Sequence, residues 1–263
     1  MAGRVQDKVV IITGAGEGLG RTMAVLFTQE GAQVVLAARR AEPLAGTAKL
    51  VADVGGDALV VPTDVTDEAA VEHMVAETVS SFGRVDVMLN NASQPGADLF
   101  IWEQTVDNWN RCIAAVVTGP MLCTREVLRQ SMLERRRGSI VNFSSTASWQ
   151  GIPRKSHYSV AKAGLRTLTK VAAKEAGPYG IRVNCLVPGG IQTDLLFRYH
   201  ERMAAERGIT TEEVYAESAA GNALRRIALP EETAAAALFL ASDESSAITG
   251  QSLTVDAGSY MAG

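Results

Sequence analysis

Short, continuous apolar runs recur along the chain and alternate with segments of helical pattern. The runs are KVVIIT (8–13), QVVLAA (33–38), ALVVP (58–62), VDVMLN (85–90), GSIVNFS (138–144), IRVNCLV (181–187) and SLTVD (252–256). Strands without polar alternation are typical of a sheet that is covered on both faces. Helices between successive strands then act as right-handed crossovers. The pattern predicts an α/β fold with a doubly wound parallel sheet of about seven strands and helices on both faces.

The spacing of these runs predicts one domain over residues 1–263, since no Pro/Gly/Ser-rich linker or charge run divides the chain. Helix starts are indicated by Thr66 or Asp67 before EAAVEHMV, and by Pro230 before EETAAAALFL. The stretch 190–228 is longer and more polar than the other connections. A connection of that length indicates a substrate lid or a segment with its own helices.

Composition narrows the class of protein. Hydrophobic residues make up 47% and charged residues 21%, with a net charge of −4. This balance argues against a nucleic-acid partner, which requires a basic surface. The densest basic run, Arg135–Arg137, is expected to end a helix and to be solvated.

The cysteines and the N-terminus bear on the compartment. Cys112, Cys123 and Cys185 lack disulfide or zinc spacing, so no metal is expected, and the first two are interpreted as packed thiols. No apolar signal core precedes the first run, and no apolar stretch reaches the roughly 18 residues of a membrane span. We expect a cytoplasmic protein without a membrane partner.

The first apolar run leads into a glycine-rich turn, KVVIITGAGEGLGRTMAVLF. Gly14 lets the chain reverse, Gly18 lets the backbone approach a pyrophosphate, and Gly20 permits close packing of helix on strand. The spacing is T-G-x-x-x-G-x-G, because Leu19 occupies the last glycine position of the more common G-x-G-x-x-G. Such a turn alone is as typical of a simple chain reversal as of phosphate binding. Its place between a strand and a helix favours a bound dinucleotide.

A second motif carries acid–base chemistry. Ser145 precedes Tyr158 by thirteen residues, and Lys162 follows Tyr158 by four, one helical turn away. An ammonium there is expected to lower the pKa of a tyrosine, which is ordinarily about 10. Ser145 is expected to hold a carbonyl or hydroxyl oxygen, with Ser144 as the adjacent alternative. A Tyr-x-x-x-Lys spacing alone arises readily by chance.

Together these motifs resemble the short-chain dehydrogenase/reductase family, in particular its 3-oxoacyl-ACP reductase-like members. The resemblance runs from end to end and rests on Thr13-Gly14, Gly18, Gly20, Asp64, Asn90-Asn91-Ala92, Ser145, Tyr158, Lys162, Pro188-Gly189, Thr193 and the tail FLASDESSAITGQSLTVDAG. It implies a single Rossmann-like domain, a homotetramer or homodimer, and a small-molecule substrate. The implied activity is an NAD- or NADP-dependent interconversion of secondary alcohols and ketones.

The resemblance also implies residue roles. Tyr158 exchanges the proton, Lys162 lowers its pKa and contacts the nicotinamide ribose, and Ser145 orients the substrate oxygen. Asp64 is expected at the adenine, Asn90 near the ribose, and Ile191 and Thr193 at the carboxamide. The full set expected at the cofactor is Gly14, Glu17, Gly18, Leu19, Gly20, Arg39, Asp64, Val65, Asn91, Ala92, Tyr158, Lys162, Pro188, Gly189, Ile191 and Thr193.

The end of the second apolar run bears on which dinucleotide is bound. A carboxylate there would bond the ribose 2′-hydroxyl of NAD and repel the 2′-phosphate of NADP. The run ends Ala-Ala-Arg-Arg instead, and Arg39 can pair with a phosphate. Glu17 in the glycine turn argues in the other direction. The balance favours NADP(H), with NAD(H) as the alternative.

One position departs from the family pattern. Relatives carry an asparagine in a W-x-x-x-x-x-x-N-x-x-G pattern, where it holds a water that links the lysine to solvent. Trp109 and Gly119 align with that pattern, and Val116 takes the asparagine position. Valine has no donor or acceptor. A proton relay through other groups is the favoured interpretation; a slow enzyme and a catalytically silent dinucleotide-binding or scaffold protein are the alternatives. Ser93 replaces a common glycine.

Substrate contacts are the least specified. Ser145, Trp149, His157 and Leu195 are expected at the substrate cleft, although for Trp149 a core or oligomer contact fits equally. His157 is interpreted as a neighbour of the cleft and not as the base, because adjacent helical residues point in different directions. Aromatic and aliphatic walls favour a moderately hydrophobic ketone or secondary alcohol.

Overall fold

A computed structural model describes residues 3–261. Its core is a seven-stranded sheet in the order β3-β2-β1-β4-β5-β6-β7, in which every neighbouring pair is parallel. The strands are β1 (Val9–Thr13), β2 (Gln33–Ala38), β3 (Ala58–Pro62), β4 (Val87–Asn90), β5 (Gly138–Phe143), β6 (Ile181–Pro188) and β7 (Ser252–Val255). The predicted doubly wound parallel sheet is confirmed, and each strand falls within the apolar run that predicted it, to within a residue.

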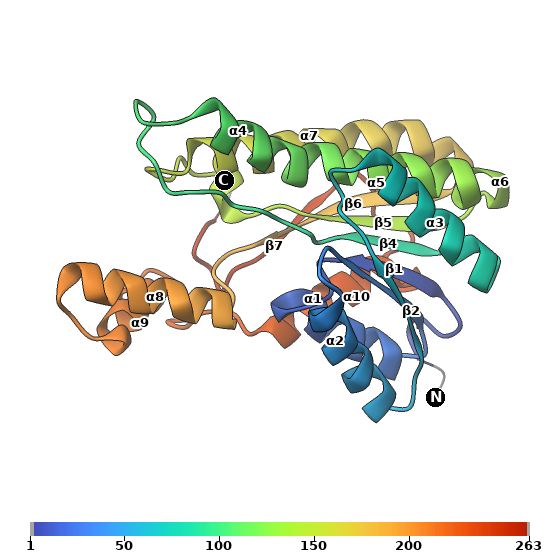
Figure 1. Cartoon of the computed structure of the whole chain (residues 1–263), viewed down its shortest axis with the longest axis horizontal. Helices are drawn as coiled ribbons and strands as arrows, with labels where there is room; N and C mark the ends of the chain where they lie inside the picture. Colours follow the sequence, from blue (N-terminus) through green and yellow to red (C-terminus); the bar gives the residue numbers. More distant parts are fainter. Residues whose placement is uncertain (1–2, 262–263) are drawn as a thin grey trace.

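Helices cover both faces of the sheet (Figure 1). One layer holds α1 (Gly18–Gln29), α2 (Ala41–Asp53) and α10 (Pro230–Ala241). The other holds α3 (Glu68–Phe82), α4 (Val106–Ile113), α5 (Gly119–Val127) and α7 (Ser156–Ala176). Two π-helical segments, Ala114–Thr118 and Leu128–Met132, join α4, α5 and α6 (Leu133–Arg135) into one helical rod.

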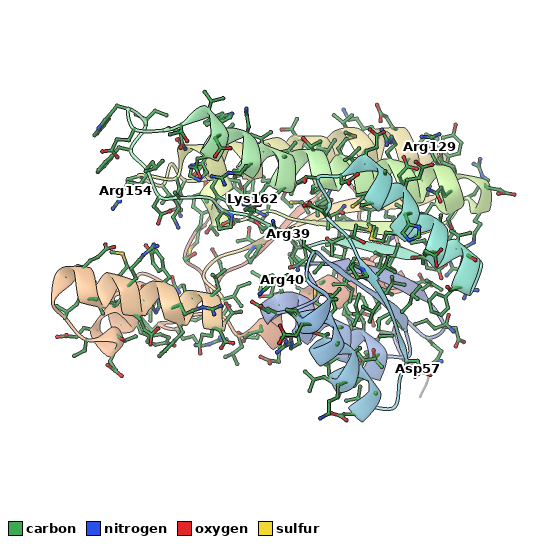
Figure 2. The ribbon with its side chains drawn as sticks, viewed as in Figure 1. Arg39, Arg40, Asp57, Arg129, Arg154 and Lys162 are labelled. Carbon is green, nitrogen blue, oxygen red and sulfur yellow. The ribbon has the colours of Figure 1, made fainter. Side chains whose placement is uncertain are left out.

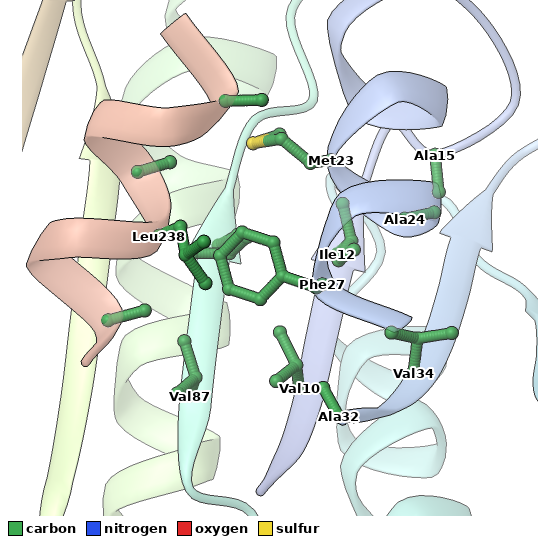
Figure 3. Packing of buried hydrophobic residues seen from close by; sticks show 14 of the residues in the cluster. Val10, Ile12, Ala15, Met23, Ala24, Phe27, Ala32, Val34, Val87 and Leu238 are labelled. Atoms are coloured by element: carbon green, nitrogen blue, oxygen red, sulfur yellow. The ribbon is translucent and has the colours of Figure 1, made fainter. Parts of the chain in front are cut away.

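Strand periodicity divides the core between these layers. Val10 and Ile12 of β1 face α1 and α10, whereas Val9 and Ile11 of the same strand face the other layer. Phe27 of α1 lies between β1, β4 and Leu238 of α10 (Figure 3). Both faces of a central strand are therefore buried, which is why the strands are apolar without alternation.

The helix ends follow the sequence signals. Of the two candidates, Asp67 caps α3, and its carboxylate accepts hydrogen bonds from the Ala69 and Ala70 amides. Pro230 is the first residue of α10. The basic run lies at the end of α6, as predicted. Two of its arginines form ion pairs as well as meeting solvent: Arg135 pairs with Asp86 at 2.8 Å, and Arg137 with Asp243 at 2.9 Å.

The stretch 190–228 carries its own helices, as one of the two predictions had it. Helices α8 (Asp194–Arg207) and α9 (Thr211–Ala220) pack on each other and stand beside the main body (Figure 1). A bidentate ion pair between Arg207 and Glu217 joins them. Arg202 of α8 pairs with Asp98 at 3.0 Å, so the helix pair is tied to the loop after β4.

Phe27 offers a test of the core. Replacing it with alanine is expected to lower the free energy of unfolding by about 3–5 kcal/mol, because a fully buried aromatic leaves a cavity. Urea denaturation followed by circular dichroism measures this loss. Phe197→Ala, on an exposed position of α8, is the matched control and should change stability by less than about 0.5 kcal/mol. A loss for Phe27→Ala no larger than that of the control would contradict the packing described.

Candidate active site

The glycine turn between β1 and α1 borders a cavity of about 240 Å³ at the carboxyl ends of the first strands. Gly14 has a φ of +70°, and a Cβ there would lie 2.9 Å from Asn91 Nδ2. A Cβ on Gly20 would lie 2.1 Å from the Gly14 carbonyl oxygen. Gly18 also has a positive φ, +52°. A side chain would clash at Gly14 and Gly20 and would be strained at Gly18, so the turn carries backbone alone near the start of α1, which fits the pyrophosphate of a dinucleotide.

Residues after β4 lock this turn in place. The Asn91 side chain donates to the carbonyl oxygens of Thr13 at 2.9 Å and Gly14 at 3.3 Å. The Thr13 hydroxyl accepts from the amides of Asn91 and Ala92. Because β1 and β4 are neighbours where the strand order reverses, these bonds fix the edge at which such sheets bind ligands.

Asn90 does not lie where it was expected. Its side chain is buried and donates to Asn142 Oδ1 at 2.8 Å and to Thr124 Oγ1 at 3.4 Å, under the sheet. The correction follows from strand alternation: Asn90 is the last residue of β4, and its side chain points into the helical layer on the face of α5.

Six residues expected at the cofactor line the cavity: Gly14, Glu17, Arg39, Asp64, Val65 and Ala92. The Leu19 side chain is instead packed in the core, which leaves only its backbone for a ligand. The sequence interpretation missed other lining residues, among them Gly16, Pro43, Thr63, Ser93, Gln94 and Ala115. Most of them lie in the glycine turn or shortly after a strand, and this place in the sequence could have pointed to them. Ala115 borders the cavity because the helical rod packs there.

The charges around the cavity bear on the opposing signals of Arg39 and Glu17. The Glu17 carboxylate pairs with Arg40 at 2.5 Å. Figure 2 shows Arg39 and Arg40 close together beside α1. Arg39 is exposed and lines the cavity, and no ion pair involves it within residues 3–261. One guanidinium thus neutralises the acid, and the other is available to a phosphate.

The segment after β6 lies across from the glycine turn. A Cβ on Gly18 would lie 3.6 Å from Thr193 Cγ2, so the start of α8 approaches the start of α1. Ile191 forms a bridge with Ala228. Gly189 packs against Asp256, where a Cβ would lie 2.7 Å from Asp256 Cβ. Pro188 is the last residue of β6. Of the four expected residues of this segment, only Thr193 is placed against the glycine turn, and none of the four lines the cavity.

Tyr158 and Lys162 lie one turn apart on α7. Lys162 is labelled in Figure 2. The Lys162 ammonium lies 5.5 Å from the centre of the Tyr158 ring and donates to the Phe143 carbonyl oxygen at 2.6 Å. Ser145 and Ser93 lie near enough to the Tyr158 phenol to lower its pKa. The three expected residues are therefore brought together, and Ser93 joins them.

The expected lowering of the tyrosine pKa is wrong for this structure. Burial raises the pKa of Tyr158 to about 12, and the nearby Ser145 and Ser93 hydroxyls only partly oppose it. Burial also lowers the pKa of Lys162 to about 8. The ammonium stabilises the phenolate less than the apolar surroundings destabilise it, because it is bonded to a backbone carbonyl instead.

The choice between the two adjacent serines is now decided by geometry. Ser144 is buried and donates to the Lys162 carbonyl oxygen at 2.8 Å, which fastens β5 to α7. Ser145 follows β5 in extended conformation, caps the short helix Thr146–Ser148, and reaches Tyr158. Of the two serines, Ser145 is therefore the one near Tyr158.

His157 cannot contact a substrate, which corrects its assignment to the cleft. The ring is fully buried; Nε2 donates to the Pro95 carbonyl at 2.6 Å, and Nδ1 accepts from Gln104 at 2.6 Å. Gln104 is bonded in turn to Asn108, which holds both backbone groups of Ala97. The imidazole therefore helps to fix the conformation of the loop after β4 from its buried side.

The other two residues expected at the substrate, Trp149 and Leu195, lie in different surroundings. Trp149 stacks on Tyr260 with a centroid distance of 5.8 Å, and the Arg166 guanidinium covers its ring. It forms part of a contact between α7 and the C-terminal segment. Leu195 at the first turn of α8 is 65% exposed, and Phe197 beside it is 57% exposed. These two present apolar surface close to Thr193.

Val116 is fully buried in a small apolar cluster with Cys112 and Ala161, against which Tyr158 packs. It lies in the π-helical segment before Pro120. Proline lacks the amide that would continue the helical hydrogen bonds, which accounts for the irregular turn. The cysteines are packed thiols: burial raises the pKa of Cys112 to about 11 and that of Cys123 to about 12.

Comparison with known proteins identifies the family. The sequence model of the family described as enoyl-(acyl carrier protein) reductase matches residues 14–260. The short chain dehydrogenase/reductase astE of Aspergillus oryzae is 38% identical over 97% of this chain and 95% of its own. The 3-oxoacyl-[acyl-carrier-protein] reductase FabG of Thermotoga maritima is 36% identical over 97% of this chain and 98% of its own. The chain belongs to the short-chain dehydrogenase/reductase family.

Solved structures agree with this assignment. Levodione reductase superposes with a TM-score of 0.91 at 33% identity, covering 96% of this chain and 97% of that one. Carveol dehydrogenase from Mycobacterium avium, in complex with NAD, gives 0.92 at 31% identity, with 98% and 99% covered. Actinorhodin polyketide ketoreductase with NADPH gives 0.92 at 32%, with the same coverage. The protein is an NAD(P)-dependent oxidoreductase that acts on CH–OH or C=O groups.

No helix within residues 3–261 is long and apolar enough to cross a membrane. Within the same range, no group of three or more His, Cys, Asp or Glu side chains is arranged to hold a metal ion.

The buried lysine predicts a stability change. Lys162→Met is expected to raise the free energy of unfolding at pH 7 by about 3 kcal/mol, because the native state holds this ammonium against a pKa lowered to about 8. At this lysine the unfolded state binds more protons between pH 8 and pH 10.5, so the stability advantage of Lys162→Met over wild type should shrink as the pH rises through that window. Urea titrations at several pH values measure both effects.

The control is Lys174→Met, an exposed position of the same helix, which should leave stability and its pH dependence unchanged. Parallel curves for wild type and Lys162→Met would contradict the buried-ammonium interpretation.

Proposed function

We propose that this enzyme interconverts secondary alcohols and ketones with NADP(H) as the preferred cofactor. The observation that carries the proposal is Tyr158, flanked by Ser145 and Lys162, connected through Ser93 to the nucleotide cavity. When bound, the nicotinamide supplies or accepts the hydride. The chain's own residues would hold the substrate oxygen and move its proton.

In alcohol oxidation the substrate hydroxyl proton passes to Tyr158, and in ketone reduction the Tyr158 phenol returns one. Ser145 would hold the substrate oxygen beside that phenol, and Lys162 would favour the phenolate once its ammonium faces the phenol. Steps of this kind typically contribute about 10²–10⁴-fold in rate. A phenol with a pKa raised to about 12 fits the acid of ketone reduction.

NADP(H) is favoured by the charges at the cavity. Arg39 is exposed and unpaired within the described range, while Arg40 neutralises Glu17. A phosphate on the adenosine ribose would meet a cation and no free acid. The solved relatives include both an NAD and an NADPH complex, so the preference of this chain depends on these residues.

The substrate we propose is a moderately hydrophobic secondary alcohol or ketone. Residues 190–228 would act as a lid, and α8 offers the exposed apolar side chains of Leu195 and Phe197 just after Thr193. Carveol dehydrogenase and levodione reductase are the similar proteins whose substrates make the natural probes. A panel of carveol, levodione and the polar triol glycerol tests the polarity of the cleft.

Arg39→Ala tests the cofactor. Loss of one charge-assisted contact should weaken NADPH binding by about 10- to 100-fold and leave NADH binding nearly unchanged. Fluorescence titration with both nucleotides measures this. Lys49→Ala removes an exposed charge from the outer part of α2 and controls for long-range electrostatics. An equal effect of Arg39→Ala on both nucleotides would refute the assignment.

Tyr158→Phe tests the chemistry. Turnover of the best panel substrate should fall by at least about 10²-fold, since the proton donor is lost, while nucleotide binding is kept. Wild-type protein that binds nucleotide and turns over no alcohol or ketone would instead favour the alternative of a silent dinucleotide-binding protein.

A further inference from the structure

One cluster of side chains joins the middle of helix α8 to the body of the protein. Asp98, in the loop after β4, accepts a hydrogen bond from Arg202 of α8 at 3.0 Å and lies 3.8 Å from the Lys155 ammonium. The ring of Tyr199, one turn before Arg202, has its centre 5.0 Å from the Lys155 ammonium and 5.3 Å from the Arg202 guanidinium. Each cation therefore contacts both the carboxylate and the face of the ring.

The body side of this cluster is held by main-chain contacts. The Leu99 amide donates to the Arg154 carbonyl oxygen at 2.9 Å, and the Arg154 guanidinium donates to the Asp98 carbonyl oxygen at 3.2 Å. Asn108 binds both backbone groups of Ala97, the residue before Asp98. The loop after β4 and the start of α7 thus form one frame, to which α8 is attached.

The same frame carries groups of the candidate active site. Lys155 is the N-cap of α7, and Tyr158 lies in the first turn of that helix. Ser93, near the start of the loop after β4, lines the nucleotide cavity. At its other end α8 starts next to the glycine turn, where a Cβ on Gly18 would lie 3.6 Å from Thr193 Cγ2. Helix α8 therefore runs from the glycine turn toward the end of α7 that bears Tyr158.

The balance of charge in the cluster depends on Asp98. Arg202 also lies 3.9 Å from Glu206, but this acid belongs to the same helix. Within residues 3–261, Asp98 is the only acid that forms an ion pair with either cation across the contact. One carboxylate thus joins two cations, one from each side. Without it, Lys155 and Arg202 would remain beside the same ring and would repel each other.

We propose that Asp98 is a positioning residue of this enzyme, which holds α8 closed over the substrate by binding Arg202 and Lys155 together. The inference rests on the proposed function, in which residues 190–228 are the substrate lid. A closed lid excludes water from the cleft and holds the substrate against Tyr158. The helix has to leave Asp98 each time a substrate enters or a product departs.

Hydrogen exchange followed by mass spectrometry tests the contact without a substrate. In the purified protein, Asp98→Ala should increase the exchange rate of the α8 amides, residues 194–207, by about 5- to 10-fold, because the two remaining cations repel. Lys155→Ala should change the rate by less than about twofold, since the pair of Asp98 with Arg202 remains. In the double variant Asp98→Ala/Lys155→Ala the repulsion is gone, and exchange should return most of the way to wild type.

Salt and a matched control sharpen this test. Raising the salt concentration from about 0.05 M to about 0.5 M should speed α8 exchange in wild type, where it screens an attraction, and slow it in Asp98→Ala, where it screens a repulsion. Arg198 lies on the same helix, is exposed and forms no ion pair within residues 3–261, so Arg198→Ala should behave as wild type. Unchanged exchange in Asp98→Ala, or the same response to salt in both proteins, would overturn the proposal.

Kinetics test whether the contact acts on the substrate. With the best panel substrate, Asp98→Ala should raise KM by about 5- to 10-fold without lowering kcat or weakening NADPH binding, because an open lid weakens the binding of substrate and transition state alike. Adding Lys155→Ala should bring KM back toward wild type. An unchanged KM in Asp98→Ala would overturn the positioning role while the proposed function stands. Wild-type protein that turns over no substrate would instead count against the proposed function, and the exchange data would still decide whether Asp98 holds α8.

Discussion

The close approach of the glycine turn to the end of β4 is the contact on which the rest of the site depends. The Gly20 and Gly14 backbones touch so closely that no Cβ fits between them, and Asn91 bonds the turn from the neighbouring strand. This contact aligns the start of α1, the cavity and the segment that begins with Ser93. A cavity for the nucleotide and a hydroxyl beside the phenol thus come from one piece of packing.

Around that contact, the charged groups of the nucleotide cavity are exposed, whereas the acid–base pair on α7 is buried. At the cavity, Glu17 pairs with Arg40, and Arg39 has no ion-pair partner within residues 3–261. The acid–base pair on α7 is held in apolar surroundings, where burial opposes both charged forms. Such a pair costs folding free energy, and the two covered faces of the sheet supply the stability that tolerates it.

The strands, helices and local motifs could be predicted because each is determined by residues that are neighbours in the sequence. Strand runs, the cap at Asp67 and the glycine turn each depend on a few adjacent positions. The pKa of Tyr158 was not predictable, because it is raised mainly by burial among side chains that meet only in the folded chain, and hydrogen bonding with Ser145 opposes this only in part. His157 was misplaced for the same reason: its partners Pro95 and Gln104 lie more than fifty residues away in sequence. The alternation of β4 alone would have separated Asn90 from Asn91 correctly.

The substitution at Val116 acquires its meaning from this packing. An apolar side chain in the rod removes a polar contact beside Lys162, yet it also fills the turn that Pro120 distorts and completes the surface on which Tyr158 rests. Val116 therefore supports Tyr158 through apolar packing alone, and within residues 3–261 the Lys162 ammonium meets a main-chain carbonyl and no polar side chain. The substitution exchanges a possible polar contact for a firmer apolar support of the ring, which is consistent with the raised pKa of the buried phenol.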